Sequence, residues 1–533
     1  MAQWNKTTQT YRAIGGQSQD TTLHEVFMQA DQYGNILNEG ATHRSAFGEL
    51  VSIPITPVIQ LDGLYGLDPN KFETFTGTFT GSAGTATTTN TSMQVATDGG
   101  ASIGSYGVIR SRRAVRYRPG QGALTRFTAK FSAGTAGYTQ RAGFFAQEQA
   151  IQIGYDGESF GVLLENGGKA HIHRFLITTL NAGDVTVTLN SDGSPPVITV
   201  SGSTLGDRIA SLAVGLEADN DFAGAWIIEY DTTKICFLSK SLGAKNGTYS
   251  MTSTATISTT NSAIQSGVAT NAVWTPQTSF NIDTLDGNGP SGITINPQKL
   301  NVYQINFRWL GSGELRYAME NPVNGDMIFF HHQHNSGIND DVYIDNPSLK
   351  LGYVAASLGG QNSAITVEGA SMMGAIEGII SATDLPDAVD NTRTAGMSGG
   401  TNEWTILGLR NNVIHKEKIN TREIILKRLA IGGTSAGGAP LIMTIWYNPV
   451  TAANLSWVAR GEDGAASYST TETTVTTTGL VPLFTSVISD NTSDNIVLED
   501  LRIVIPPNNE IVVTAKSAAN INRANIGLTW IED

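Results

Sequence analysis

Residues 301–319 read Asn-Val-Tyr-Gln-Ile-Asn-Phe-Arg-Trp-Leu-Gly-Ser-Gly-Glu-Leu-Arg-Tyr-Ala-Met. Apolar and polar side chains alternate on both sides of a Gly-Ser-Gly turn, and this pattern is typical of an antiparallel hairpin with one buried face. The apolar face is expected to comprise Tyr303, Ile305, Phe307 and Trp309 before the turn and Leu315, Tyr317 and Met319 after it. We therefore expect these side chains to belong to the core, with no ligand role.

The same alternation recurs along most of the chain, whereas helical periodicity is rare. Strand-length segments separated by glycine-rich turns predict a sandwich or jelly roll. A helix is expected over 205–218, where Ile209, Leu212, Ala213 and Leu216 share one face. Thr204 precedes it in the position of an N-cap, with Asp207 three residues later.

The predicted fold class is mainly β and multi-domain, with a concanavalin-like jelly roll, a small inserted α+β domain and a C-terminal β-sandwich. The expected parts are an N-terminal attachment arm (1–72), the jelly roll (73–169 with 281–380), the insert (170–280), a linker (381–400) and the C-terminal sandwich (401–533). The prolines at 54 and 57 favour an arm laid on another surface, although an irregular first strand of the jelly roll explains them equally well.

Composition limits the possible functions. Net charge is −14 and only 15% of the 533 residues are charged, which argues against a general nucleic-acid binder. The one cysteine excludes an intrachain disulfide framework. There is no apolar signal core at the N-terminus and no apolar run long enough to span a bilayer, so we expect a protein made in the cytoplasm without membrane insertion.

A local concentration of positive charge occurs within this acidic chain. Eight of the 33 lysines and arginines fall between Arg110 and Arg141. In an extended segment Arg112, Arg116 and Arg118 share one face, which suits an anion or acidic-glycan site, a subunit contact, or pairing with the chain's own carboxylates. The last two interpretations are favoured, because single-sign clusters in acidic proteins often meet acidic partners.

No catalytic residue and no cofactor are predicted. His332 and His334 follow an apolar strand on one face and are weak metal candidates, since a chelate would need a further carboxylate. Gly-x-Ser-x-Gly occurs around Ser159, Ser398 and Ser435, but none of these serines is followed by the helix that a nucleophile elbow needs.

Several segments together resemble a group of virion structural proteins from tailed phages and some large DNA viruses. The resemblance covers roughly residues 40–380. It is carried by Ala46–Leu50 with Thr56–Gln60, Leu64–Leu67, Arg116–Gly122 with Arg126–Ala129, Gly154–Gly157 with Phe160–Val162, and Asn296–Tyr303. It implies a non-enzymatic component of the virion, whose arm contacts other virion proteins. Such assemblies are symmetric, and a homotrimer is favoured.

The leading hypothesis is a phage virion protein, in a tail fibre, baseplate or surface fibre, that assists host attachment. Placement on the capsid as a decoration or head-fibre protein is an alternative. Two other classes remain open. One is a stand-alone carbohydrate-binding lectin module, and the other is a polysaccharide depolymerase with paired carboxylates, for which Glu314, Glu320 and Asp326 are possible residues.

Overall fold

The structure is a computed structural model. It describes residues 54–78, 82–100, 104–189, 195–359, 363–378, 385–461, 463–478 and 480–533, together with the backbone of four short N-terminal strands. These strands are β1 (Trp4–Asn5), β2 (Thr10–Arg12), β3 (Phe27–Ala30) and β4 (Ile36–Leu37). The chain divides into two compact units, Met1–Ile55 and Thr56–Asp533. Most of the predicted arm lies outside the described residues.

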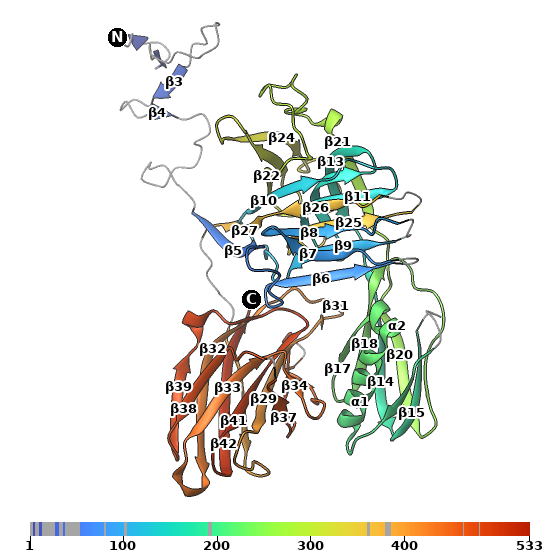
Figure 1. Ribbon diagram of the computed structural model, residues 1–533, viewed down its shortest axis with the longest axis vertical. Coiled ribbons are helices and arrows are strands. Elements are labelled where there is room, and N and C mark those ends of the chain that lie inside the picture. Colours follow the sequence, from blue (N-terminus) through green and yellow to red (C-terminus); the bar gives the residue numbers. More distant parts are fainter. Residues whose placement is uncertain are drawn as a thin grey trace. The chain divides into compact units, whose positions relative to one another are not determined.

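The predicted jelly roll consists of two sheets that enclose one core (Figure 1). The first sheet runs in the order β24 (Met327–Gln333), β23 (Leu315–Glu320), β22 (Asn301–Phe307), β10 (Ala123–Phe131), β26 (Thr366–Gly369), β8 (Ser92–Ala96) and β7 (Thr85–Thr89), with β27 (Ser371–Glu377) paired to β10 and to β5 (Ile55–Asp62). The second runs β21 (Asn271–Pro276), β13 (Ser159–Asn166), β12 (Ala150–Asp156), β11 (Tyr138–Phe145), β25 (Lys350–Ser357), β9 (Tyr106–Ser111) and β6 (Phe72–Gly77). The mainly β fold class is thereby confirmed.

The hairpin predicted from residues 301–319 is present as β22 and β23. Ile305 pairs with Tyr317, and all the side chains of the predicted apolar face up to Phe307 and from Leu315 onward are buried. Phe307 packs edge-on against Phe144 of the other sheet, with 5.2 Å between ring centroids. Burying a side chain of this size contributes about 1.5 to 3 kcal/mol, so this hairpin is a main source of core stability. Trp309 lies beyond the strand and donates from Nε1 to the Ile344 carbonyl at 2.7 Å.

The inserted domain is α+β, as predicted. Its two sheets are β17 (Trp226–Tyr230), β18 (Lys234–Leu242), β14 (Ala170–Leu180) and β20 (Ile257–Gln265), and β16 (Val197–Val200), β15 (Gly183–Leu189) and β19 (Tyr249–Ser253). Helices α1 (Leu205–Ala218) and α2 (Asn220–Ala225) lie against β17 and β18 (Figure 1). Thr204 and Asp207 form the expected capping box at the start of α1, and the predicted apolar face is buried.

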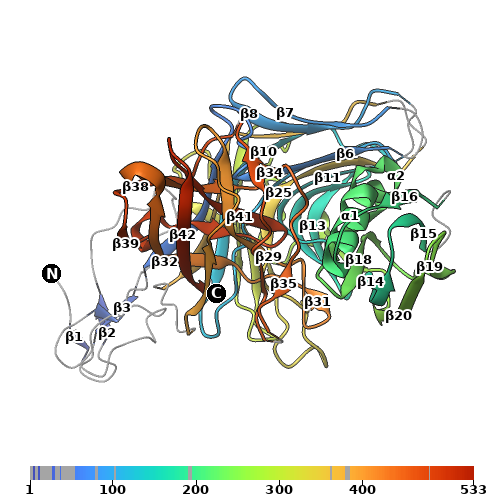
Figure 2. The same cartoon turned by 90° about the horizontal axis from the view of Figure 1, so that it is seen from below.

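The C-terminal domain is a second sandwich, seen from below in Figure 2. One sheet runs β28 (Asp387–Arg393), β42 (Ile521–Glu532), β32 (Ile424–Ser435) and β39 (Thr492–Val497), with β40 (Val504–Ile505) paired to β32. The other runs β34 (Val450–Thr451), β37 (Thr474–Thr476), β29 (Glu403–Asn411), β41 (Asn509–Lys516), β33 (Leu441–Tyr447) and β38 (Phe484–Ile488). In addition, β36 (Ala466–Ser469) pairs with β29, and β35 (Val458–Ala459) pairs with β36.

Three predicted boundaries need correction. Strand β5 joins the first jelly-roll sheet, so the expected arm (1–72) includes a strand of the sandwich. Strand β21 pairs with β13, so the jelly roll resumes before the predicted end of the insert at 280. The expected linker (381–400) contains β28, which pairs with β42 along its whole length. In each case the strand is short, polar or proline-containing, and it joins the sheet by pairing with a strand that is distant in the sequence.

Within the described ranges, no helix combines the length and the apolar character needed to cross a bilayer.

Candidate functional site

The predicted arginine cluster lies where the jelly roll meets the C-terminal sandwich. Arg116 Nη1 is 3.2 Å from Asp533 Oδ1, and Arg118 donates to the other oxygen of the same carboxylate. Arg112 donates from Nη1 to Asn509 Oδ1 at 3.0 Å and from Nε to the Pro69 carbonyl. These arginines therefore join two domains of one chain, and for Arg116 and Arg118 the structure shows the third interpretation, pairing with a carboxylate of the chain itself.

Arg113, the neighbour of Arg112, forms a further ion pair at this junction. Arg113 donates from Nη2 at 2.8 Å and from Nε at 3.1 Å to Glu423 Oε2. Its Nη1 also donates to the Val58 carbonyl of β5 at 3.3 Å. Two donors of one guanidinium therefore converge on the Glu423 carboxylate, which restricts their relative orientation at the junction of the two domains.

The two histidines proposed as weak metal candidates lie near one carboxylate that is already engaged. The rings of His332 and His334 are 6.0 Å apart, and His334 Nδ1 is 3.9 Å from Glu314 Oε2. Arg316 donates to the other oxygen of Glu314. No group of three or more His, Cys, Asp or Glu side chains suited to a metal ion is found in the described part of the chain.

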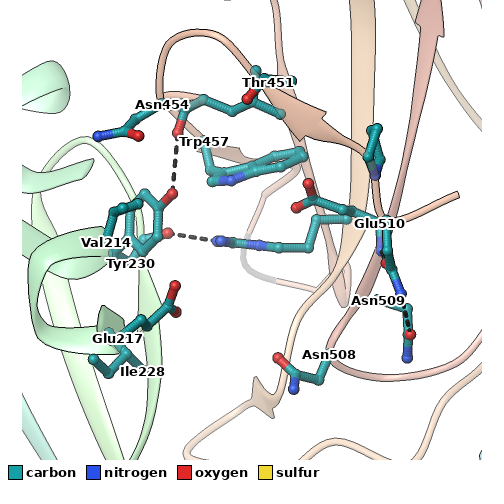
Figure 3. Close-up of a pocket in the computed structure, with 14 residues that line it drawn as sticks. Val214, Glu217, Ile228, Tyr230, Thr451, Asn454, Trp457, Asn508, Asn509 and Glu510 are labelled. Atoms are coloured by element: carbon teal, nitrogen blue, oxygen red, sulfur yellow. Dashed lines mark hydrogen bonds between the residues drawn. The ribbon is translucent and has the colours of Figure 1, made fainter. Parts of the chain in front are cut away.

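A polar pocket lies between the insert and the C-terminal sandwich (Figure 3). Its volume is about 250 Å³. Its lining comprises Val214, Glu217, Ile228, Tyr230, Arg410, Asn448, Pro449, Thr451, Asn454, Leu455, Trp457, Asn508, Asn509 and Glu510. Glu217 and Tyr230 come from the insert, and Trp457 and Glu510 from the sandwich, so the pocket exists only where the two domains meet.

Arg410 is the central side chain of this pocket. Its guanidinium lies 5.0 Å from the centroid of the Tyr230 ring and 4.7 Å from that of Trp457. It also donates from Nη2 to the Tyr230 carbonyl at 2.5 Å. The Tyr230 hydroxyl donates to the Leu455 carbonyl at 3.3 Å, shown as a dashed line in Figure 3. A cation between two aromatic faces is attracted to both, which ties the insert to the sandwich.

Strand register places an acid beside this cation. Arg410 at the end of β29 pairs directly with Glu510 of β41. Asn448 holds that strand end, because its Oδ1 accepts from Glu510 N at 2.8 Å and its own N donates to Glu510 O at 2.9 Å. An opposite-charge pair directly across two strands stabilises their registration.

The carboxyl group of Glu510 exchanges protons near neutral pH. Burial raises the pKa of Glu510 to about 7, although Arg410 opposes the shift, and the neighbouring Glu217 adds to it. Partial desolvation also raises the pKa of Glu217 above its ordinary value. With a pKa of about 7, the charge of Glu510 and hence of the pocket changes near neutral pH.

Replacing Glu510 with glutamine is expected to stabilise the protein at pH 8 by about 1 to 2 kcal/mol and to change little at pH 4.5. The folded-state pKa lies above the ordinary value of 4.5. Protonation therefore favours the folded state at low pH, and this contribution is lost as the pH rises toward 7. Melting temperatures measured from pH 4.5 to 8 test this, with the exposed Glu320→Gln as control. An equal shift at every pH would contradict it.

Sequence reasoning missed Tyr230, Arg410, Trp457 and Glu510 as site residues. No local pattern in the sequence shows that strands β17 and β29, which carry Tyr230 and Arg410, meet in space. The one available signal is a charged residue at the end of an apolar strand, at Arg410, and such residues are usually solvated.

Comparisons with known proteins add little. No family model matches the chain, and no curated protein sequence matches it. Among solved structures, arcelin-5, a lectin-like defence protein from Phaseolus vulgaris, is 9% identical, covering 61% of this chain and 97% of its own, with a TM-score of 0.22. Peanut lectin with a 9mer peptide is 11% identical, covering 61% of this chain and 100% of its own, also at 0.22.

A lectin from Bauhinia forficata in complex with GalNAc is 9% identical, with 61% of this chain and 98% of its own covered, at a TM-score of 0.20. The likeness to these lectins is distant in both sequence and structure. The description of the sandwich rests on the strand pairing of this chain itself.

Proposed function

We propose that the chain is a non-catalytic structural component of a phage particle, in a tail fibre, baseplate or surface fibre, and that it assists attachment to the host. The motifs quoted from residues 40–380 support this role by their order and combination. Because they supply no binding residue, the proposal concerns assembly rather than a particular ligand.

The observation that carries the proposal is the way the domains of Thr56–Asp533 are joined. Arg113 and Arg116 bind carboxylates of the C-terminal sandwich, and Arg410 lies between aromatic rings of the insert and the sandwich. A buried cluster contains side chains of both, among them Leu216 and Trp457. Three β-rich domains joined in this way suit a structural component of an assembled particle, and Met1–Ile55 is a separate unit of the chain.

Purified particles of the virus that encodes the chain provide the test. We expect mass spectrometry to detect the chain in gradient-purified particles, and immunogold labelling to place it on the tail or on a surface fibre. Antiserum against a non-structural protein of the same virus is the control. Labelling of the capsid alone would favour the decoration or head-fibre alternative, and absence of the chain from purified particles would overturn the proposal.

The attachment role has a separate readout. Particles grown from a genome with an early stop codon in this gene should adsorb to host cells at least tenfold more slowly, and supply of the intact gene in trans should restore adsorption. Normal adsorption of particles that lack the chain would leave a structural role without attachment. Light scattering of the purified chain tests the expected homotrimer.

A further inference from the structure

The outer face of the sheet β28-β42-β32-β39 contains a trough with a volume of about 530 Å³. Figure 2 shows β32, β39 and β42 in one layer. Strand register explains the trough, because it aligns small residues in two neighbouring rows across the four strands. The first row is Asp390, Gly527, Ala430 and Asn495, and the second is Thr392, Asn525, Gly432 and Ser493.

Alternation along the strands confirms which way these rows face. Ile431 and Ile526, which lie between the rows, are buried in the core. Asp390, Ala430 and Asn495 are exposed on the opposite face. Since neighbours along a strand point to opposite sides of a sheet, both rows face outward. The glycines and the alanine therefore form a floor, and the polar side chains form its walls.

The walls carry hydrogen-bond donors and acceptors, and all but one of these groups are neutral. Thr392 and Ser493 supply hydroxyls, Asn495 and Asn525 supply amides, and Asp390 supplies a carboxylate. Asn525 Oδ1 is buried without a hydrogen-bond partner among the described residues. A buried acceptor without a donor is costly, and the amide that carries it belongs to the outward row of the trough.

We propose that this trough binds a neutral oligosaccharide laid across the four strands. Sugar hydroxyls both donate and accept, which matches the mixed walls, and the C–H face of a sugar ring suits a floor of glycine and alanine. The volume lies within the range of about 300 to 1,000 Å³ usual for ligand sites. Strands about 4.8 Å apart give the trough a length of about 15 Å, which favours an oligosaccharide over a single sugar.

Charge selects against acidic glycans. Asp390 stands in the first outward row of the trough, and the chain as a whole carries a net charge of −14. A uronate or sialate would therefore be repelled. The inference deepens the proposed attachment role, on which its biological meaning rests, but the binding itself is a property of the purified chain.

The sequence offers a variant that blocks the trough without disturbing the sheet. A Cβ at Gly527 would meet only Ala430 Cβ, at 3.5 Å, which is ordinary van der Waals contact. Valine suits a strand, so Gly527→Val should fold normally while its side chain occupies the floor. Asn525→Ala removes one wall group and leaves the floor open. Thr87→Val, on the exposed face of β7 in the jelly roll, is the matched control.

The full-length chain is tested first on an array of neutral and acidic glycans and then by calorimetry with the neutral oligosaccharide that gives the strongest signal. We expect binding to a neutral oligosaccharide, loss of more than tenfold in affinity with Gly527→Val, and a loss of about two- to tenfold with Asn525→Ala. Thr87→Val should bind like the unaltered chain, and thermal melts should show all variants folded.

Three results would overturn the inference. These are no binding to any neutral oligosaccharide at millimolar concentration, binding confined to acidic glycans, and equal binding by folded Gly527→Val. A free host oligosaccharide and the intact host polysaccharide are compared in separate arms, to distinguish a soluble ligand from a surface receptor. If the purified chain binds a neutral glycan but is absent from virus particles, only the virion proposal fails. If the chain is found in particles but binds no neutral glycan, only the inference about the trough fails.

Discussion

Replacing Trp457 with alanine is expected to destabilise the joined insert and C-terminal sandwich by about 3 to 5 kcal/mol. The indole is 1% exposed and belongs to a buried cluster shared by the two domains. It lies 4.7 Å from the guanidinium of Arg410, and the space above Gly408 is filled by its ring. The substitution therefore opens a cavity and removes one of the two aromatic faces that hold Arg410.

Differential scanning calorimetry of the full chain measures this effect. A loss of this size should lower the melting temperature of the affected transition by about 10 °C. Trp457→Phe should lower it less, because the smaller ring keeps part of the packing and a face for the cation. Tyr65→Ala is the control, since that side chain is 94% exposed. A drop of less than about 2 °C for Trp457→Ala would show that the two domains do not depend on this contact.

The features predictable from the sequence are those determined within a few residues. The hairpin of β22 and β23 follows from strict alternation on both sides of one turn, and α1 follows from its apolar face and the capping box at Thr204. In both cases, burial and local hydrogen bonding favour the same conformation. Where local pattern and tertiary packing agree in this way, the structure of a segment can be predicted from its sequence alone.

Strands whose pairing partners are distant in the sequence were not predicted. Strand β28 contains only Ala388 and Val389 as apolar residues, so its sequence resembles a linker. Its place in the sandwich comes from β42, more than 120 residues further along the chain. Strand β5 contains Pro57, which favoured an arm in the sequence, but it pairs with β27 at the edge of the jelly roll.

The candidate sites also depend on contacts between residues that are distant in the sequence. The concentration of arginines was visible in the sequence, and so was the excess of carboxylates that could bind them. The particular partner was not, because Asp533 lies 415 residues beyond Arg118. The pairing of Arg410 with Glu510 depends on a register between β29 and β41 that no local pattern specifies. The trough is similar, since glycines at 432 and 527 matter only once β32 and β42 lie side by side.

Arg393 at the end of β28 should be as sensitive as a core residue, although it lies in the segment expected to be a linker. Its side chain is 5% exposed, and it donates to the carbonyls of Thr405 at 2.9 Å, Ala395 at 3.2 Å and Thr473 at 3.4 Å. Its guanidinium also lies 5.1 Å from the centroid of the Trp404 ring. Because Thr405 belongs to β29, one side chain connects the two sheets of the C-terminal sandwich.

We expect Arg393→Ala to cost about 3 kcal/mol, because several buried carbonyls lose their donor at once. Arg393→Lys should recover only part of the loss, since an ammonium cannot reproduce the planar set of donors. Arg460→Ala is the matched control. That arginine is 40% exposed and pairs with Asp387 of the same strand at 3.1 Å, so its loss should cost under about 1 kcal/mol.

Hydrogen exchange distinguishes a local loss of anchoring of β28 from a general loss of stability. If Arg393 anchors β28, amides of 387–393 should exchange faster in Arg393→Ala under native conditions, while amides of the jelly-roll strand β22 keep their protection. Unchanged protection in β28 would mean that pairing with β42 alone holds the strand. The anchored strand also carries Asp390 and Thr392, so a chain with Arg393→Ala should lose glycan binding in the trough before the rest of the sandwich unfolds.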